Sequence, residues 1–376
     1  MAPAPGSGGQ TLGVGLNMTR ESDPGKIFER ASEIDPDLAW RGRRKVDLSV
    51  RRIRPTRWQR DHLFRAMSLG LPVIYRDYPA PLHRPDISEE DRVTRLLAAM
   101  ASTRLDYRVR TRIGKYWRYF TPTELAGKWQ RGRTPLNITD FHIEGTAMES
   151  VIKHRVLSEF NLLPLMSEDV AWIEMMTLVI SGVGGFSDSH SDDCDGSNHC
   201  FTGRKLWLAW DTGEGLAAGL EDLDQQRVHG KCAFDLATWL ALDSARWFTV
   251  EAGQTLFMPG HFTHKVITLD AYLGVGSFYI AFPNLIRTLA RWQCRRPNWE
   301  RLEANSLKEV VYREIPARSL RRFRQLQKTS EANRNKWGLG QLEESWHQWR
   351  RGSSSQELAN LRSLPALDRL LEATGI

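Results

Sequence analysis

The chain has 376 residues, of which 41% are hydrophobic and 10% aromatic, and this composition is typical of a folded protein with a sizeable core rather than a disordered one. No apolar run approaches the ~20 residues that cross a bilayer, and the N-terminal residues lack the apolar stretch of a secretory signal. We therefore expect no membrane contact and an intracellular location. The four cysteines show no CxxC spacing, which favours a reducing compartment without disulfides.

The formal net charge of +7 is unevenly distributed along the chain. Nine basic residues and one acid, Asp47, lie between Arg41 and Arg60, and a second basic stretch runs from Arg313 to Lys336. Segment 41–60 could contact the phosphates of nucleic acid or of a nucleosome. The alternative is a solvated basic surface, which is common for such runs.

The first third of the chain is predicted to be mixed. Residues 1–25, rich in Gly, Pro, Ala and Ser, are expected to form a tail. A helix is predicted over Thr56–Ser68, a buried strand over Leu71–Arg76, and a second helix over Ile87–Ala101, which Ser88 can cap.

The centre of the chain changes to short strand-like runs that Gly-rich or Asp-rich turns separate. This rhythm predicts an antiparallel barrel or sandwich. The predicted strands are Ala171–Ser181, Lys205–Trp210, Trp247–Val250, Thr255–Met258, Lys265–Leu269 and Tyr272–Ile280, and the predicted helical insertions are Gly215–Leu223 and Phe234–Leu242.

After Pro283 the pattern becomes helical. The predicted helices are Leu285–Trp292, Ser306–Ile315, Ala317–Asn333, Leu339–Arg350 and Gln356–Ala373, with a linker at Gly352–Ser355. These helices could support a homodimer.

One short motif carries the chemistry. His190 and Asp192 form an H-x-D pair, and residues two apart on an extended segment point to the same side, so an imidazole and a carboxylate can converge on one ion. His264, 74 residues later, supplies a third ligand. Two histidines and one carboxylate on one face leave three coordination positions open, as in the facial triad with which iron(II) activates dioxygen. The open positions accept a bidentate 2-oxo acid and then dioxygen.

Lys205 and Ser187 extend the predicted site. Lys205 begins a predicted strand 15 residues after His190, where it can enter the barrel and meet the distal carboxylate of 2-oxoglutarate. A buried ammonium needs such a partner because its desolvation is otherwise costly. Ser187 could add a hydroxyl to the same carboxylate. The alternative for Lys205 is an exposed lysine at a strand end, and the alternative for His190 is a histidine at a turn with no metal-binding role.

Two other groupings compete with this assignment. His261 could replace His264 as third ligand, but a strand beginning near Thr263 would put His264 at its start and His261 on the preceding turn. Cys194, His199 and Cys200 could suggest zinc, although their spacing matches no structural zinc site. We interpret the segment that contains them as an active-site loop.

These residues, in this order, resemble the JmjC family of oxygenases. Gly253–Pro259 followed by His264 is similar to the strand and turn before that family's last metal ligand. The resemblance is closest to the branch that in animals includes the PHD-finger and CXXC-containing lysine demethylases. Segments upstream of the metal motif also resemble that branch, and the whole resemblance spans roughly Leu71 to Asn284. The upstream segments are Trp117–Phe120, Pro135–Phe141 and Glu144–Thr146.

The resemblance implies a mainly β fold, a double-stranded β-helix of cupin or jelly-roll type with helical additions. It implies Fe(II) on His190, Asp192 and His264, and 2-oxoglutarate on Lys205, with Ser187, Asn137 and Asn198 lining the same pocket. The domains expected on this basis are a tail at 1–25, a helical or mixed region at 26–134 packing on the barrel, a JmjC-like barrel at 135–284 and a helical region at 285–376.

The resemblance also implies oxidative decarboxylation of 2-oxoglutarate by dioxygen, coupled to oxidation of a C–H bond. On an N-methyl group this gives amine and formaldehyde, and on a side-chain carbon it gives an alcohol. We expect a protein or peptide substrate, including histone methyl-lysine, and Asp188, Asp193 and Asp195 around the metal motif would favour a basic peptide. A histone demethylase would be nuclear and other oxygenases cytoplasmic. The alternatives are an oxygenase for a small molecule or RNA, and a non-catalytic cupin that binds a ligand.

Overall fold

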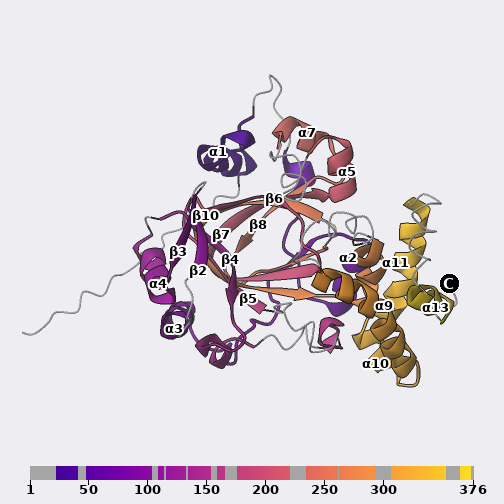
Figure 1. The fold of residues 1–376 in the computed structure, drawn as a ribbon. Coiled ribbons are helices and arrows are strands. Elements are labelled where there is room, and N and C mark those ends of the chain that lie inside the picture. Colours follow the sequence, from indigo (N-terminus) through magenta and orange to yellow (C-terminus); the bar gives the residue numbers. More distant parts are fainter. Residues whose placement is uncertain are drawn as a thin grey trace, which may run out of the picture.

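The computed structural model describes most of the chain. The described residues are 23–40, 48–103, 109–113, 116–132, 134–153, 159–165, 176–220, 234–260, 262–290, 292, 306–352 and 365–373. Over this part the molecule is a mixed α/β protein in which helices flank one antiparallel sheet (Figure 1).

The ten strands that the structure describes form a single hydrogen-bonded sheet. They are β1 (Val73–Tyr75), β2 (Val109–Ile113), β3 (Tyr116–Phe120), β4 (Leu136–His142), β5 (Met176–Ser181), β6 (Phe186–His190), β7 (Asp195–Asp211), β8 (Arg246–Glu251), β9 (Thr255–Met258) and β10 (Phe262–Tyr279). The order along the sheet is β1-β9-β7-β10-β5-β4-β2-β3, with β6 beside β10 and β8 beside β7.

Helices surround this sheet (Figure 1). The α-helices are α1 (Pro24–Ile34), α2 (Arg60–Ser68), α3 (Glu89–Ser102), α4 (Pro122–Arg131), α5 (Thr212–Ala217), α7 (Leu236–Ala241), α9 (Ser306–Gln327), α10 (Glu331–Lys336), α11 (Leu339–Gly352) and α13 (Pro365–Ala373). Short 3₁₀ turns are η1 (Pro36–Leu38), η2 (Leu48–Arg51), η3 (Ala147–Ser150), η5 (Leu163–Leu165) and η7 (Phe282–Asn284). None of the helices within the described ranges combines the length and apolarity required to cross a membrane.

The two longest strands, β7 and β10, divide the sheet into two halves. They pair with each other along nearly their whole length, but each exchanges its other neighbour midway. β7 pairs first with β9 and then with β8, while β10 pairs first with β6 and then with β5. We call β6, β8 and the paired parts of β7 and β10 the narrow half, and the remaining strands the wide half.

Gly203 lies at the point where β7 passes from one half to the other. Its φ is +89°, a conformation that L side chains rarely adopt, and a Cβ there would lie 2.1 Å from the carbonyl oxygen of Ala271. The β7–β10 register shifts at the same level, between Thr268 and Gly274 of β10. A bulged, glycine-containing pair bends both strands, so the two halves turn toward each other.

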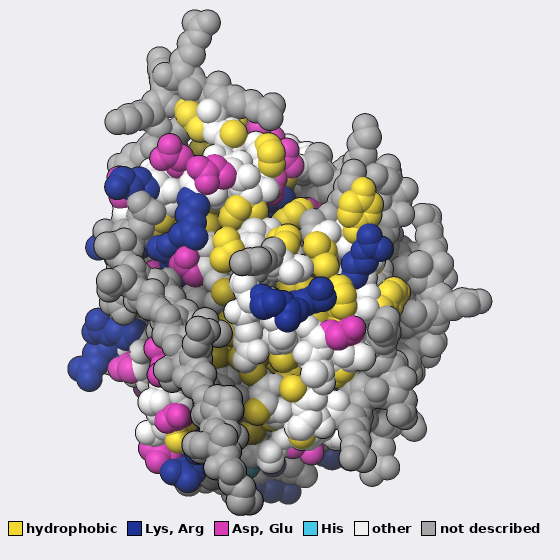
Figure 2. All heavy atoms as spheres, turned by 90° about the vertical axis from the view of Figure 1, so that its left-hand side faces the viewer, with side chains coloured by type: hydrophobic (Ala, Val, Ile, Leu, Met, Phe, Trp, Pro, Cys, Tyr) yellow, Lys and Arg dark blue, Asp and Glu magenta, His cyan; other side chains and the backbone are white. Residues whose placement is uncertain are grey.

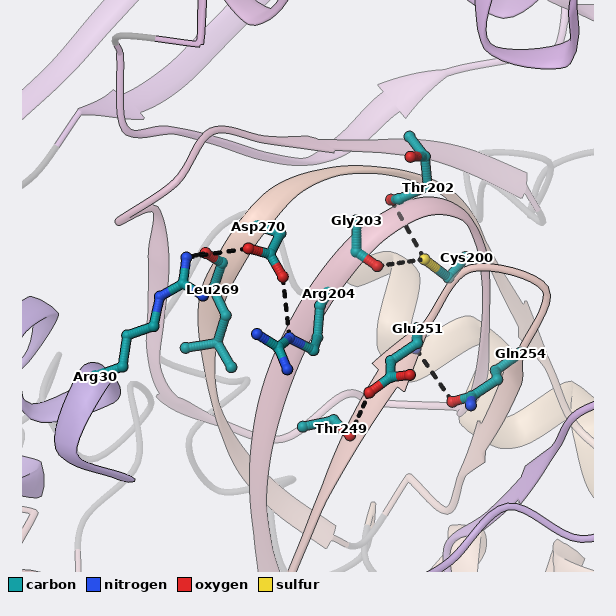
Figure 3. A network of polar contacts seen from close by, with 10 residues as sticks. All are labelled: Arg30, Cys200, Thr202, Gly203, Arg204, Thr249, Glu251, Gln254, Leu269 and Asp270. Carbon is teal, nitrogen blue, oxygen red and sulfur yellow. Dashed lines mark hydrogen bonds and ion pairs between the residues drawn. The ribbon is translucent and has the colours of Figure 1, made fainter. Parts of the chain in front are cut away.

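Asp270 stabilises this bend from outside. Its carboxylate accepts a hydrogen bond from Arg204 Nε at 3.0 Å and another from Arg30 Nη2 at 3.0 Å (Figure 3). Arg204 is buried, and Arg30 comes from α1. The ion pairs therefore join α1, β7 and β10 at the bend. Figure 3 also shows the Cys200 thiol directed at the carbonyl oxygens of Thr202 and Gly203, 3.3 and 3.6 Å away.

The hydrophobic core is arranged around the bent sheet. One cluster draws side chains from both halves and includes Val179, Trp207, Phe248, Leu256 and Tyr272, so it fills the space between them. Three other clusters join helices to the sheet: α3 and α4 to β4 and β5, α1 and α7 to the narrow half, and the C-terminal helices to α2, β9 and the end of β10. Burial on both faces explains the long apolar runs of these strands.

Several predicted elements are confirmed with adjusted ends. α3 begins after Ser88, whose hydroxyl accepts from the Asp91 amide, as predicted. The helix expected from Thr56 starts only at Arg60, because the Thr56 backbone pairs with the Ile74 and Arg76 backbone next to β1.

Three predictions about element boundaries are wrong. Lys265–Leu269 and Tyr272–Ile280 are not two strands but parts of β10. Pro316 does not separate two helices, since α9 continues through it and ends only at Gln327, before α10 begins. The segment around His199 and Cys200 is not a loop, because β7 begins at Asp195. The predicted linker lies largely outside the described residues.

Candidate metal centre

The structure brings together the three residues that the sequence predicts as ligands. One ligand atom each from His190, Asp192 and His264 lies within 4.8 Å of the others. His264 Nε2 is 3.9 Å from Asp192 Oδ2, and the two imidazole centroids are 4.3 Å apart. His264 is buried, while the other two are half-buried. This is a group of donors that could hold one metal ion.

Strand pairing sets this geometry. His190 ends β6, His264 lies near the start of β10, and the two are directly paired in the antiparallel register. Directly opposite residues project on the same face of a sheet, so both rings reach the same side. A bulge between His264 and Val266 shifts the register next to the pair. Asp192 follows two residues after His190, beyond the strand end.

Backbone carbonyls orient both imidazoles. His190 Nδ1 lies 2.7 Å from the carbonyl oxygen of Asp188, and His264 Nδ1 lies 3.3 Å from that of Phe262. A carbonyl only accepts, so Nδ1 carries the proton and Nε2 keeps its lone pair. Burial, followed by the neighbouring His190, lowers the pKa of His264 well below its ordinary value. The His264 ring is therefore neutral, which a metal ligand must be.

Lys205 is buried in the space between the two halves of the sheet. Its side chain is nearly inaccessible, and its Nζ lies 4.7 Å from the centroid of the Tyr272 ring. Burial lowers the pKa of Lys205 to about 7, and Cys200 opposes this shift slightly. A buried ammonium with a depressed pKa is a group that an anionic ligand would stabilise.

Thr268 is a residue of this site that sequence reasoning missed. It pairs directly with Lys205 across β7 and β10, so both side chains project on the same face. Its Oγ1 is buried without a hydrogen-bond partner among the described residues. Buried hydroxyls are normally satisfied, so this orphaned group points to a missing polar partner beside the lysine. In the sequence Thr268 is one more threonine in a largely apolar strand, and nothing in its neighbours marked it as a site residue.

Asn137 and Ser187, both predicted pocket residues, contact each other. Asn137 Nδ2 donates to Ser187 Oγ at 2.9 Å and to the Phe186 carbonyl at 3.1 Å, and Asn137 Oδ1 accepts from Ser181 Oγ at 2.9 Å. Ser187 pairs with Val266 on β10. The network thus ties β4 of the wide half to β6 of the narrow half, next to the histidines.

Asn198 is joined to Lys205 through Tyr272. The Tyr272 hydroxyl donates to Asn198 Oδ1, while the ring lies under the ammonium of Lys205. Burial, with a smaller contribution from Cys200, raises the pKa of Tyr272 well above its ordinary value, so the phenol remains a donor. The sequence analysis placed Asn198 in the expected co-substrate pocket but did not single out Tyr272, which begins a predicted strand.

The acidic residues expected to attract a basic substrate are partly engaged elsewhere. Asp188 lies 3.7 Å from Lys265 Nζ, which also pairs with Asp35 at 2.7 Å. Asp195 is fully buried, and its Oδ1 accepts from the Gly260 amide and from Asn284 Nδ2. Burial raises the pKa of Asp195 to about 7. These two carboxylates therefore support the strands around the site rather than face a substrate.

The other candidate metal ligands and the basic segment 41–60 can also be compared with the structure. His199 Nδ1 lies 2.7 Å from Thr255 Oγ1, and within the described part of the chain His199, Cys194 and Cys200 form no metal-binding group. His261 lies outside the described residues. In segment 41–60, residues 41–47 are likewise outside them, while Arg52 packs over Trp247 and Arg60 pairs with Glu159. Contact of this segment with nucleic acid stays a prediction.

No protein-family model matches this chain, and no curated protein sequence matches it either. The antiparallel core and the His-x-Asp…His group are consistent with a cupin or JmjC-like fold, and they carry the functional argument alone.

Proposed function

We propose that this protein is a non-haem Fe(II)- and 2-oxoglutarate-dependent dioxygenase of JmjC type. The observation that carries the proposal is the convergence of His190, Asp192 and His264, whose ligand atoms lie within 4.8 Å of one another. Two imidazoles and one carboxylate are the donor set of the facial triad, which leaves positions for a co-substrate and oxygen.

The chemistry of the donors supports a resident ion. Both histidines offer Nε2 while Nδ1 donates to a carbonyl, which is the arrangement seen around metal-ligating histidines. Burial holds His264 neutral. When bound, iron would supply the oxidising chemistry with dioxygen and 2-oxoglutarate. This chain's residues would hold the ion, orient the co-substrate and exclude water.

Lys205 and Thr268 support a dicarboxylate co-substrate. The register places Lys205 of β7 opposite Thr268 of β10, and Ala209 of β7 opposite His264 of β10. The levels of Lys205 and His264 in the sheet therefore differ by four residues. Four residues of strand span about 13 Å, part of which the lysine stem and the imidazole occupy. A five-carbon dicarboxylate anchored by Lys205 at one end could reach the triad with its 2-oxo acid end. The ammonium and the orphaned Thr268 hydroxyl would then gain a partner.

The strand order supports a double-stranded β-helix. In this architecture two antiparallel sheets of four strands face each other. Here β5, β10, β7 and β9 run side by side in the wide half, and β6, β10, β7 and β8 in the narrow half. Both halves contribute to the cluster that lies between them. We infer that the sheet folds into this barrel, with the JmjC-like domain at 135–284.

We infer a protein side chain as substrate, either hydroxylated or N-demethylated. Trp207, whose ring centroid is 5.1 Å from that of His264, would exclude water from one flank.

Anaerobic titration with Fe(II) and 2-oxoglutarate tests the proposal. The expected result is a weak visible charge-transfer band, followed by succinate formation on exposure to air. His190→Ala should remove both, while His62→Ala, which replaces a histidine bonded to the Tyr75 hydroxyl on the far side of the sheet, should keep both. Absence of the band in the intact protein would favour a ligand-binding protein without catalysis.

Product analysis tests the substrate. Methylated histone peptides should release formaldehyde if the protein is a lysine demethylase. A mass increase of one oxygen without formaldehyde would instead identify a side-chain hydroxylase. Turnover of neither class of peptide, with intact 2-oxoglutarate turnover, would contradict the assignment to a protein substrate and leave the dioxygenase assignment standing.

A further inference from the structure

The hairpin of β2 and β3 exposes aromatic side chains at one end of the sheet. β3 is the last strand in the order and pairs, among the described strands, with β2 alone. Tyr116, Trp117 and Tyr119 are 58%, 52% and 55% exposed. A single exposed aromatic residue needs no explanation, but three large aromatic side chains within four residues, each more than half exposed, form a patch that does.

The aromatics occupy both faces of β3. Side chains alternate along a strand, so Trp117 and Tyr119 share one face while Tyr116 and Phe120 share the other. On the second face Arg118 lies over the Tyr116 ring at 5.9 Å, and Lys128 of α4 lies over Phe120 at 4.7 Å. Flat rings and cations therefore lie next to one another along the strand.

The local charge is strongly positive. From Tyr107 to Arg133 the sequence has eight Lys or Arg residues and one acid, Glu124. The carboxylate of Glu124 accepts from the Thr121 amide and closes the capping box of α4, so it is engaged locally. Across the hairpin, Arg110 and Arg112 stand at the register positions opposite Tyr119 and Trp117. Figure 2 turns this side of the molecule toward the viewer and shows hydrophobic, Lys and Arg side chains beside one another.

Protection of a sheet edge explains the charge but not the rings. Edge strands avoid aggregation through lysine, proline or inward-pointing charges, whereas exposed tryptophan and tyrosine increase the hazard. A protein strand adding to β3 would use the backbone edge and would not require eight cations. Cations track phosphates, and aromatic rings stack on unpaired bases, so together they match a single-stranded polynucleotide.

We propose that the β2–β3 hairpin, with the adjoining side of α4, binds single-stranded RNA. Trp117 and Tyr119 stack on bases, and Arg118 and Lys128 contact phosphates. The site lies outside the metal centre and binds without iron or 2-oxoglutarate. It is a different stretch of the sequence from segment 41–60.

Fluorescence anisotropy with a labelled mixed-sequence 12-nucleotide RNA tests the proposal on the full chain without metal or co-substrate. We expect saturable binding that weakens as salt increases. Because each stacked base contributes about 1–3 kcal/mol, removing both rings in Trp117→Ala with Tyr119→Ala should weaken binding at least about thirty-fold. Trp117→Phe with Tyr119→Phe keeps two stacking rings and should stay within about two-fold of the unchanged protein.

A matched control is Leu71→Ala, which removes a 42% exposed apolar side chain next to β1, at the opposite end of the strand order. It should bind RNA like the unchanged protein, and thermal unfolding should show that all variants fold, since the replaced side chains are exposed. Equal binding by the double-alanine variant would overturn the proposal. So would equal or tighter binding of an RNA duplex or a DNA strand of the same sequence.

Sedimentation velocity tests whether the hairpin instead binds a second copy of the chain. A monomer–dimer equilibrium that the double-alanine variant abolishes, without RNA binding, would assign the hairpin to a second copy of the chain and refute the proposal. None of these results depends on the metal centre, so failure here leaves the dioxygenase assignment untouched, and failure of the iron titration leaves RNA binding untouched.

Discussion

Replacing Lys205 by Met removes a buried ammonium while keeping an unbranched side chain of similar length. The structure places this ammonium between the two halves of the sheet, against the Tyr272 ring, with no carboxylate in ion-pair distance among the described residues. The variant should therefore fold more stably than the unchanged protein when 2-oxoglutarate is absent, and it should fail to bind 2-oxoglutarate.

The size of this effect follows from the pKa of Lys205. Burial lowers that pKa to about 7, against an ordinary value of 10.5. Between these two pH values the unfolded chain binds one proton more than the folded chain, so stability rises with pH over this window. Below about pH 7 the lysine is charged in both states and the full penalty applies. At about 1.4 kcal/mol per pH unit, the penalty is at most about 5 kcal/mol.

Urea unfolding of both proteins from pH 6 to pH 10 measures this difference. Lys205→Met should be more stable at pH 6 by up to about 5 kcal/mol, and the difference should shrink toward zero near pH 10. Burial also raises the pKa of Cys200, which lowers stability at high pH in both proteins, so comparing the two proteins removes most of that contribution. A difference that does not change with pH, or a less stable variant at pH 6, would refute the reasoning.

Three further predictions concern the frame of the site. Gly203→Ala should lower the free energy of unfolding, measured by urea titration, by about 3 kcal/mol or more, because the new Cβ would lie 2.1 Å from the Ala271 carbonyl oxygen. The control is Gly219→Ala, which is also at positive φ but has open space around it and should lower the free energy of unfolding by only about 1 kcal/mol. Because the pKa of Asp195 is raised to about 7, the folded chain binds the extra proton from about pH 4 to pH 7, and stability falls across that window by up to about 4 kcal/mol relative to Asp195→Asn; parallel curves for the two proteins would contradict this assignment. Thr268→Val removes a buried hydroxyl without a partner, so it should leave apo stability equal or higher while weakening 2-oxoglutarate binding several-fold by calorimetry; an unchanged affinity would exclude Thr268 from the pocket.

The metal centre could be predicted from sequence because its spacing is local. His190 and Asp192 are two apart, and an extended segment brings such residues to one side, although Asp192 lies just beyond the end of β6. His264 required the further expectation of a strand starting beside it, which β10 fulfils. Lys205 was singled out because it was expected to start a strand 15 residues after His190, whereas in the structure it lies in the middle of β7. The role of each residue, including iron and 2-oxoglutarate binding, stays a proposal.

Long-range pairing is what the sequence did not reveal. Asp195, Asn198 and His199 have low strand propensity, so β7 was expected to begin ten residues too late. In the fold one side-chain atom of each is hydrogen-bonded to Gly260, Tyr272 and Thr255 respectively, which come from distant segments. The orphaned Thr268 hydroxyl and the exposed face of β3 likewise become visible only when the register is known.

Among the described strands β6 forms a backbone ladder with β10 alone, and over only a few residues, while Asn137 of β4 adds side-chain hydrogen bonds to Phe186 and Ser187. Two of the three proposed ligands lie directly across that seam, at His190 and His264. If a metal ion is bound there, as proposed, it would hold β6 against β10, so metal binding and the ordering of this strand would be coupled. Under the proposed function, chelation would then loosen Phe186–His190 as well as remove the metal, and proteases would cut the metal-free protein more readily at this strand than they cut the loaded protein.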